Sequence, residues 1–159
     1  MRMTNAISTL FVVCLGLIAG ILVGYLASAP ARGALDPRSF LTHQQIVHIY
    51  YQPLMQILMS AAILSGLASL VRFRGQIRSV DFVLTAIAFA GVVTVFILTI
   101  SVNVPINNVM MTWNRMEPPA NMREIWAQWE SVHFVRTLVA VIAFIAATVR
   151  IGMSRIALN

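Results

Sequence analysis

Residues 80–102, VDFVLTAIAFAGVVTVFILTISV, form an apolar run with one charged side chain, Asp81, near its beginning. A helix needs about 20 apolar residues to cross the hydrocarbon core of a bilayer, so this run predicts a transmembrane helix. Three further runs have the same character, at about residues 7–29, 53–71 and 132–150. The last of them reaches the necessary length only when His133 and Arg136 are included.

The composition places the chain among integral membrane proteins. Hydrophobic residues make up 59% and charged residues 10% of its 159 residues, and the mean hydropathy is +0.84. This leaves too little polar surface for a soluble domain of that size. Lipid offers no water to the backbone, and the runs lack the strict alternation of barrel strands, so we expect helices. We therefore predict an all-α fold, a single four-helix bundle over residues 1–159 that lies in the lipid bilayer.

Arginine supplies all eleven basic residues, and its distribution predicts how the chain is oriented. Six arginines fall on one side of the predicted membrane: Arg2, Arg72, Arg74, Arg78, Arg150 and Arg155. The other side carries four, in longer segments mixed with acidic residues: Arg32, Arg38, Arg115 and Arg123. This excess predicts that both termini are cytoplasmic, and we expect a bacterial inner membrane. The net charge of +6 then reflects topology, and without a basic recognition motif we expect no nucleic-acid partner.

Gly16, Gly20 and Gly24 occupy every fourth position of the first run and form one smooth helix face. Small residues let helix backbones approach closely in membranes. We expect this face mainly to pack against a neighbouring helix of the same bundle. Formation of a homo-oligomer through the same face stays open as an alternative.

Polar side chains gather in the half of the bundle away from the predicted cytoplasmic side. The second helix is expected to begin near Ser39, well before its apolar run. It carries polar residues four positions apart on one face: Gln44, His48, Gln52 and Gln56. We expect this ladder to descend into the membrane toward the interior of the bundle.

The third and fourth helices add further polar and aromatic residues at that level. Asn103 and Asn107 share one face, with Pro105 between them free to disturb the helix. Trp126 and Trp129 precede the fourth apolar run, and we expect them to belong to an interfacial aromatic belt.

Glu130, His133 and Arg136 follow at intervals of three, where the fourth helix enters the apolar layer. Ionisable groups are costly there, and they usually have a task. One interpretation is a structural network, with Glu130 paired to an arginine and His133 bonded to a carbonyl or an amide. The other is a site in which Arg136 binds an anion or polarises a carbonyl while His133 is a base or a ligand.

Several of these residues together resemble the signature of the anthrone oxygenase-like membrane family. The matching motifs are Asn103-x-Pro105-Ile106-Asn107, Trp113, Pro118-Pro119 and Trp129-x-x-x-His133-x-x-Arg136. The resemblance implies a four-helix membrane protein, some of whose relatives oxidise polycyclic anthrones to anthraquinones with molecular oxygen. It also implies functional roles for six residues: Asn103, Asn107, Trp113, Glu130, His133 and Arg136.

The resemblance implies an oxidoreductase that acts on an apolar aromatic, phenolic or quinone-like small molecule. His133 would remove a proton from an acidic C–H, Arg136 or Asn103 would stabilise the enolate oxygen, and Glu130 would orient the imidazole or return protons. We expect four residues to line the substrate pocket: Asn107, Trp113, Gln52 and Met55.

Two alternatives stay open. The sequence requires no cofactor, but His48 and His133 could bind a single haem b or one metal ion, as in an electron-transfer protein. Alternatively, the chain is a small accessory or structural subunit of a larger membrane complex, whose polar layer tunes a neighbour's cofactor.

Overall fold

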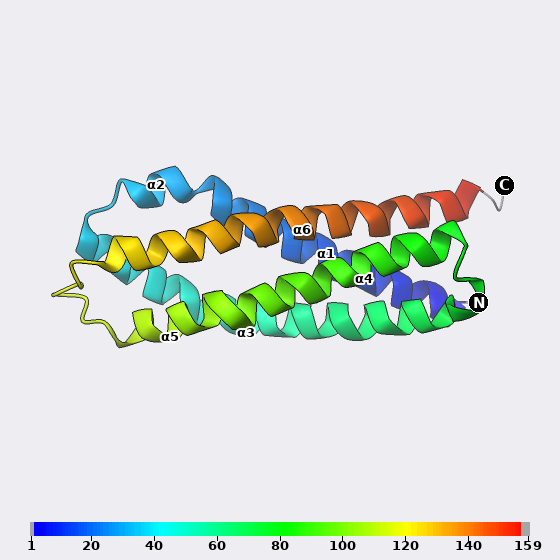
Figure 1. The fold of residues 1–159 in the computed structure, drawn as a ribbon, viewed down its shortest axis with the longest axis horizontal. Helices are drawn as coiled ribbons and strands as arrows, with labels where there is room; N and C mark the ends of the chain where they lie inside the picture. The colour runs from blue at the N-terminus through cyan, green and yellow to red at the C-terminus, as the bar shows by residue number, and fades with distance from the viewer. Residues whose placement is uncertain (1, 157–159) are drawn as a thin grey trace.

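The structure is a computed structural model that describes residues 2–156, and it contains helices and turns but no strand within that range. The elements in chain order are α1 (Arg2–Ala27), α2 (Ala29–Gly33), α3 (Pro37–Arg72), the 3-10 helix η1 (Arg74–Gln76), α4 (Val80–Leu98), the π-helix η2 (Thr99–Asn103), α5 (Val104–Thr112) and α6 (Met122–Ile156). Figure 1 shows α1, α3, α4 and α6 running along one long axis, with α2 and α5 at one end. The predicted all-α four-helix bundle is confirmed.

Four helical segments are long and apolar enough to cross a membrane: Ala6–Ala27, Pro37–Arg72, Val80–Thr112 and Met122–Met153. The third of these is made of α4, η2 and α5 in succession. Large apolar side chains also point away from the bundle, as the exposed fractions of 68% for Ile57 and 69% for Leu64 show. Such a surface suits lipid rather than water, so the chain is an integral, multi-pass membrane protein.

The helices α3 and α6 are longer than the apolar runs that predicted them. With 36 and 35 residues, each extends for more than about 50 Å, whereas the hydrocarbon core is about 30 Å thick. Their additional turns precede Pro53 in α3 and Val132 in α6. Both helices therefore extend beyond the apolar layer at the end that carries α2 and α5 (Figure 1).

The start of α3 is fixed by a cap in the turn before it. The Asp36 carboxylate accepts hydrogen bonds from the backbone N–H groups of Arg38 and Ser39, at 3.0 and 3.1 Å, and Pro37 suits the first helical position. Hydrogen bonds from Ser39 and Arg38 lower the pKa of the Asp36 carboxyl group, because they favour its charged form. The predicted start near Ser39 is thus correct to within two residues.

Two glycines allow neighbouring helices to approach closely in the core. A Cβ atom added to Gly91 of α4 would lie 2.6 Å from the Cβ atom of Ala143 in α6. A Cβ atom on Gly66 of α3 would lie 2.8 Å from the ring of Phe11 in α1. Both distances are too short for a real side chain, so the contacts of α6 with α4 and of α3 with α1 depend on these glycines.

Only part of the glycine face of α1 packs against another helix. A Cβ atom on Gly16 would lie 2.9 Å from the ring of Phe144 in α6, but one on Gly20 or Gly24 would meet nothing within 4 Å. These two glycines border an open groove beside Tyr51 of α3. The prediction that this face packs within the bundle is correct for Gly16. It is wrong for Gly20 and Gly24, because a Cβ atom at either position would have open space around it.

The third span changes its helical pitch just before Pro105. Proline has no N–H group, and its ring clashes with the carbonyl four residues earlier, so it cannot continue an ordinary helix undisturbed. The π-helix η2 ends at Asn103, and Pro105 lies in the first turn of α5. The wide turn of η2 therefore accommodates Pro105 without a clash, and it determines where the side chains of Asn103 and Asn107 point.

Trp126 and Trp129 are buried in the structure, so their assignment to an interfacial belt is wrong. Their exposed fractions are 3% and 6%. They pack with Phe40, Leu41 and Met110 in an apolar cluster, the second apolar cluster of the bundle besides the core between α1, α3, α4 and α6. The ring of Phe40 meets that of Trp126 edge to face, with centroids 5.7 Å apart. The reason for the difference is that α3 and α5 continue beside this part of α6 and cover the tryptophans.

Candidate functional site

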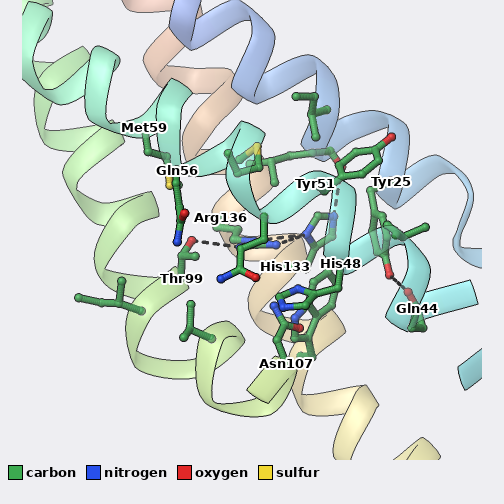
Figure 2. A pocket seen from close by; sticks show the side chains of 18 of the residues that line it. Tyr25, Gln44, His48, Tyr51, Gln56, Met59, Thr99, Asn107, His133 and Arg136 are labelled. Atoms are coloured by element: carbon green, nitrogen blue, oxygen red, sulfur yellow. Dashed lines mark hydrogen bonds between the residues drawn. The ribbon is translucent and has the colours of Figure 1, made fainter. Parts of the chain in front are cut away.

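A cavity of about 260 Å³ lies between the helices in the half of the bundle nearer to α2 and α5. Its wall comes from α1, α3, α6 and the segment from α4 through α5. The whole predicted ladder of α3 lines it: Gln44, His48, Gln52 and Gln56. Figure 2 shows how polar groups from the other helices meet this ladder. The volume is just below the usual range of about 300–1,000 Å³ for small-molecule sites, so the cavity suits a compact ligand.

His133 and Arg136 form the polar centre of the site, and both line the cavity. The Nη2 and Nε atoms of Arg136 lie 3.0 and 3.3 Å from Nδ1 of His133. The Nη1 atom of Arg136 donates to the Thr99 hydroxyl at 3.0 Å, and that hydroxyl donates to the Val95 carbonyl at 2.7 Å. The guanidinium group is thus held from α6 across to η2, as the dashed lines in Figure 2 show.

Arg136 has no acidic partner within the described part of the chain. Its exposed fraction is 7%, and the ion pair nearby, Arg32–Glu130, does not include it. A buried cation without a carboxylate is costly in an apolar layer, and it attracts any anion or polarised oxygen that enters. The arrangement can therefore bind or stabilise a negatively charged oxygen.

His133 is held on four sides. Its Nε2 atom lies 3.1 Å from the Leu22 carbonyl of α1, and its Nδ1 atom faces Arg136. The imidazole stacks on the indole of Trp129, with centroids 4.8 Å apart and planes at 13°, and meets the Tyr25 ring edge to face. Only 2% of His133 is exposed. Its ring orientation is therefore fixed by α1 and α6 together.

Glu130 takes the structural role of the two that the sequence left open, because it is paired to an arginine. Its carboxylate lies 3.6 Å from Nη2 of Arg32 in α2, and no described hydrogen bond joins it to His133. Arg32 is itself buried, with its guanidinium 3.6 Å from the centre of the Tyr25 ring and bonded to the Ser28 hydroxyl. The ion pair between Glu130 and Arg32 thus joins α6 to α2, and Glu130 lies outside the cavity wall. The prediction that it orients the imidazole is wrong, because the Leu22 carbonyl and Arg136 do so.

Asn103 and Trp113 also lie outside the cavity wall, whereas Asn107 and Met55 line it as predicted. The fully buried Asn103 donates from Nδ2 to the Trp129 carbonyl at 3.2 Å. Trp113 packs against the second apolar cluster, and its carbonyl accepts a hydrogen bond from Gln45 at 3.1 Å. Neither residue is placed to touch a ligand, because each makes its contact with the scaffold behind the cavity.

Tyr25 and Thr99 are site residues that sequence reasoning missed. Both line the cavity, and the Tyr25 hydroxyl donates to Oε1 of Gln44 at 2.5 Å. Tyr25 ends an apolar run, where tyrosine is ordinarily an interfacial residue. Thr99 lies one turn before Asn103, but that spacing gave no usable signal, because the turn is a π-helix and Asn103 itself lies outside the cavity wall.

The haem or metal alternative depended on His48 and His133 as ligands. Both ring nitrogens of His133 are already engaged by protein groups, and Glu130 is paired with Arg32. Within the described residues, no three side chains of His, Cys, Asp or Glu lie together as a metal site would require. Coordination by His48 and His133 would break the contact between His133 and Arg136, so these two histidines do not fit a haem or a metal ion.

Comparison with known proteins agrees with the membrane architecture. The family model for anthrone oxygenase matches residues 47–146, which is more than half of the chain. The chain therefore belongs to the anthrone oxygenase family. The matched region includes His48, Gln52 and Gln56 of the α3 ladder. It also includes η2, His133 and Arg136. No curated protein and no solved structure shows significant similarity to the chain.

Proposed function

We propose that the protein is a membrane oxygenase whose substrate is an apolar aromatic ketone or phenol with an acidic C–H group. The observation that carries this proposal is Arg136, a buried cation without a carboxylate partner among the described residues, facing a largely apolar cavity. A fixed cation in a water-poor site stabilises an oxygen that gains negative charge during a reaction. Membership of the anthrone oxygenase family supports the same class of reaction.

The proposed reaction converts an anthrone and dioxygen into an anthraquinone and water. A base removes a proton from the methylene group, and the electron pair of that C–H bond moves into an enolate whose oxygen faces Arg136. The electron-rich carbon then reacts with dioxygen to give a hydroperoxide after protonation. Loss of water from the hydroperoxide leaves the second carbonyl. One oxygen atom enters the product and the other leaves as water, so dioxygen is the only oxidant needed.

The cavity supplies the remaining requirements of this chemistry. Its walls are mainly apolar, as a fused aromatic ring system requires, while the amides of Gln52, Gln56 and Asn107 offer donors for phenolic or carbonyl oxygens. Thr99 and His133 hold the guanidinium group before the substrate arrives. Such preorganisation avoids a rearrangement at the moment when charge develops.

The proposal is tested by measuring oxygen uptake of the detergent-purified protein with anthrone as the probe. The wild type should raise uptake above the spontaneous rate. Arg136→Gln should lower the protein-dependent rate by about 10²–10³-fold, because a charged donor to the developing oxyanion is lost. Arg136→Lys should retain part of the rate, since it keeps the charge. Arg38→Gln, at an exposed position outside the cavity, is the matched control. Equal rates for the wild type and Arg136→Gln would contradict the proposal.

A further inference from the structure

The hydrogen bonds of His133 determine which of its nitrogens carries the proton. The Leu22 carbonyl can only accept, so the Nε2 atom that lies 3.1 Å from it must be the N–H donor. In a neutral imidazole the other nitrogen, Nδ1, then has the lone pair. That lone pair accepts from Arg136, whose Nη2 and Nε atoms lie at 3.0 and 3.3 Å. His133 therefore has no free acceptor.

His133 cannot take up a proton while this contact lasts. A proton on Nδ1 would point at the N–H groups of Arg136, two donors would face each other, and two positive charges would be in contact. The stacking on Trp129 and the edge contact with Tyr25 also prevent the ring from turning away. The geometry thus makes His133 a support for Arg136 rather than a group that receives a substrate proton.

His48, unlike His133, has a ring nitrogen that can accept a proton. It lines the same cavity from α3 and is half-buried. No hydrogen bond to either of its ring nitrogens is found within the described residues, so a nitrogen lone pair is available to a ligand. It stands one turn from Gln44 and one turn from Gln52 on the face that forms the cavity wall. Figure 2 shows it in the same pocket as Arg136, contributed by a different helix.

We propose that His48 is the catalytic base of this site and that His133 is a positioning residue that fixes Arg136. This assignment rests on the proposed function and completes it. The C–H bond of the substrate breaks, its proton goes to a ring nitrogen of His48, and its electron pair moves to the enolate oxygen that Arg136 stabilises. The imidazolium returns its proton to the peroxide oxygen after dioxygen, the oxidant, has reacted. The positive charge of the intermediate is then on His48 of α3, and the negative charge is on the enolate oxygen beside Arg136 of α6.

Hydrogen–deuterium exchange without oxygen isolates the first step. Anthrone is incubated with the purified protein in deuterated buffer under argon, and deuterium in its methylene group is followed by mass spectrometry. The matched pair is His48→Asn and His133→Asn. Asparagine can still accept from Arg136 through Oδ1, at the position of the imidazole Nδ1, so it keeps the contact that fixes Arg136, but it cannot act as a base.

We expect the wild type to accelerate exchange and His48→Asn to lower that acceleration by about 10²–10⁴-fold, the usual contribution of a general base. His133→Asn should keep most of it. Added imidazole should restore exchange to His48→Ala, since the open cavity can admit the missing ring. His43→Ala is the control, because His43 lies on the same helix, is exposed and does not line the cavity.

The outcomes separate this assignment from the proposed function. If the wild type accelerates exchange and His48→Asn does so equally, His48 is not the base and only the assignment fails. Loss of exchange in His133→Asn together with normal exchange in His48→Asn would make His133 the base. No acceleration by the wild type would overturn the proposed function and the assignment with it. Elution in gel filtration and the circular dichroism of each variant, compared with His43→Ala, show whether it is folded.

Discussion

The chemistry of the site depends on a short chain of contacts around one guanidinium group. Arg136 is held by His133 on one side and by Thr99 on the other, and each of these is fixed by a backbone carbonyl. Burying a charge is tolerable only when such bonds satisfy it. The residues that the sequence marked as a single helix face therefore divide into two groups: His133 and Arg136 serve the cavity, whereas Glu130 serves the scaffold.

Thr99→Val should separate the positioning of Arg136 from its charge. Valine has nearly the shape of threonine but cannot accept the hydrogen bond from Nη1. We expect the oxygenase rate to fall by about tenfold, equivalent to about 1.4 kcal/mol, while the KM changes little. Thr99→Ser, which keeps the hydroxyl, is the control. Steady-state oxygen uptake with anthrone measures both constants, and a Thr99→Val enzyme with the rate of Thr99→Ser would disprove the role.

Asn103→Ala should affect folding rather than catalysis. The side chain is fully buried, and its amide joins η2 to the Trp129 carbonyl of α6 instead of facing the cavity. Removing it should destabilise the protein by about 1 kcal/mol for the lost hydrogen bond, seen as a lower Tm. The folded fraction should keep the wild-type rate. A normal Tm with loss of turnover would instead return Asn103 to the catalytic role that the family resemblance implied.

At the scale of elements, helices and their faces were easier to predict than contacts between them. The ladder of α3 follows from a spacing of four residues, and all its members line the cavity. The tryptophans of α6 were misplaced because their burial depends on how far α3 and α5 continue beside them. Pairing of Glu130 with an arginine was expected, but the sequence did not indicate which one, because Arg32 lies on α2, a five-residue helix whose position no local pattern reveals.

Glycine substitutions test the helix contacts directly. Gly91→Ala should be destabilising by about 1–3 kcal/mol, because the new Cβ atom would overlap that of Ala143 and force α4 away from α6. Gly24→Ala is the matched change at a position with open space, and it should leave stability unchanged or raise it by up to about 1 kcal/mol. Thermal unfolding in detergent measures both variants. Equal Tm values for the two would show that the close α4–α6 approach is not present.

At the scale of the whole molecule, four membrane-competent helices place a polar cavity inside an apolar bundle, near the end where α2 and α5 lie. Composition was sufficient to predict the membrane class, and the lengths of the apolar runs were sufficient to predict the helix count. The cavity itself could not be predicted, because it forms where side chains of four segments leave space unfilled. The distribution of arginine further leads us to propose that the cavity end faces away from the cytoplasm of a bacterial cell.

Cysteine labelling in intact cells tests that orientation. In a Cys14→Ala background, Arg38→Cys at the cavity end should react with a membrane-impermeant maleimide, because its side chain is exposed. Arg74→Cys, in the connection between α3 and α4, should react only after the membrane is permeabilised. The positive-inside rule predicts this asymmetry. The reverse pattern would mean that the cavity end is cytoplasmic.

The central claim is that this cavity carries out an oxygenation in which Arg136 stabilises the enolate. The most direct measurement is the rate at which ¹⁸O from labelled dioxygen appears in anthraquinone, followed by mass spectrometry for wild type and Arg136→Gln beside a protein-free blank. The account predicts one labelled oxygen per product molecule, formed by the wild type well above the blank and by Arg136→Gln close to it. Label appearing no faster with wild type than in the blank would contradict the account.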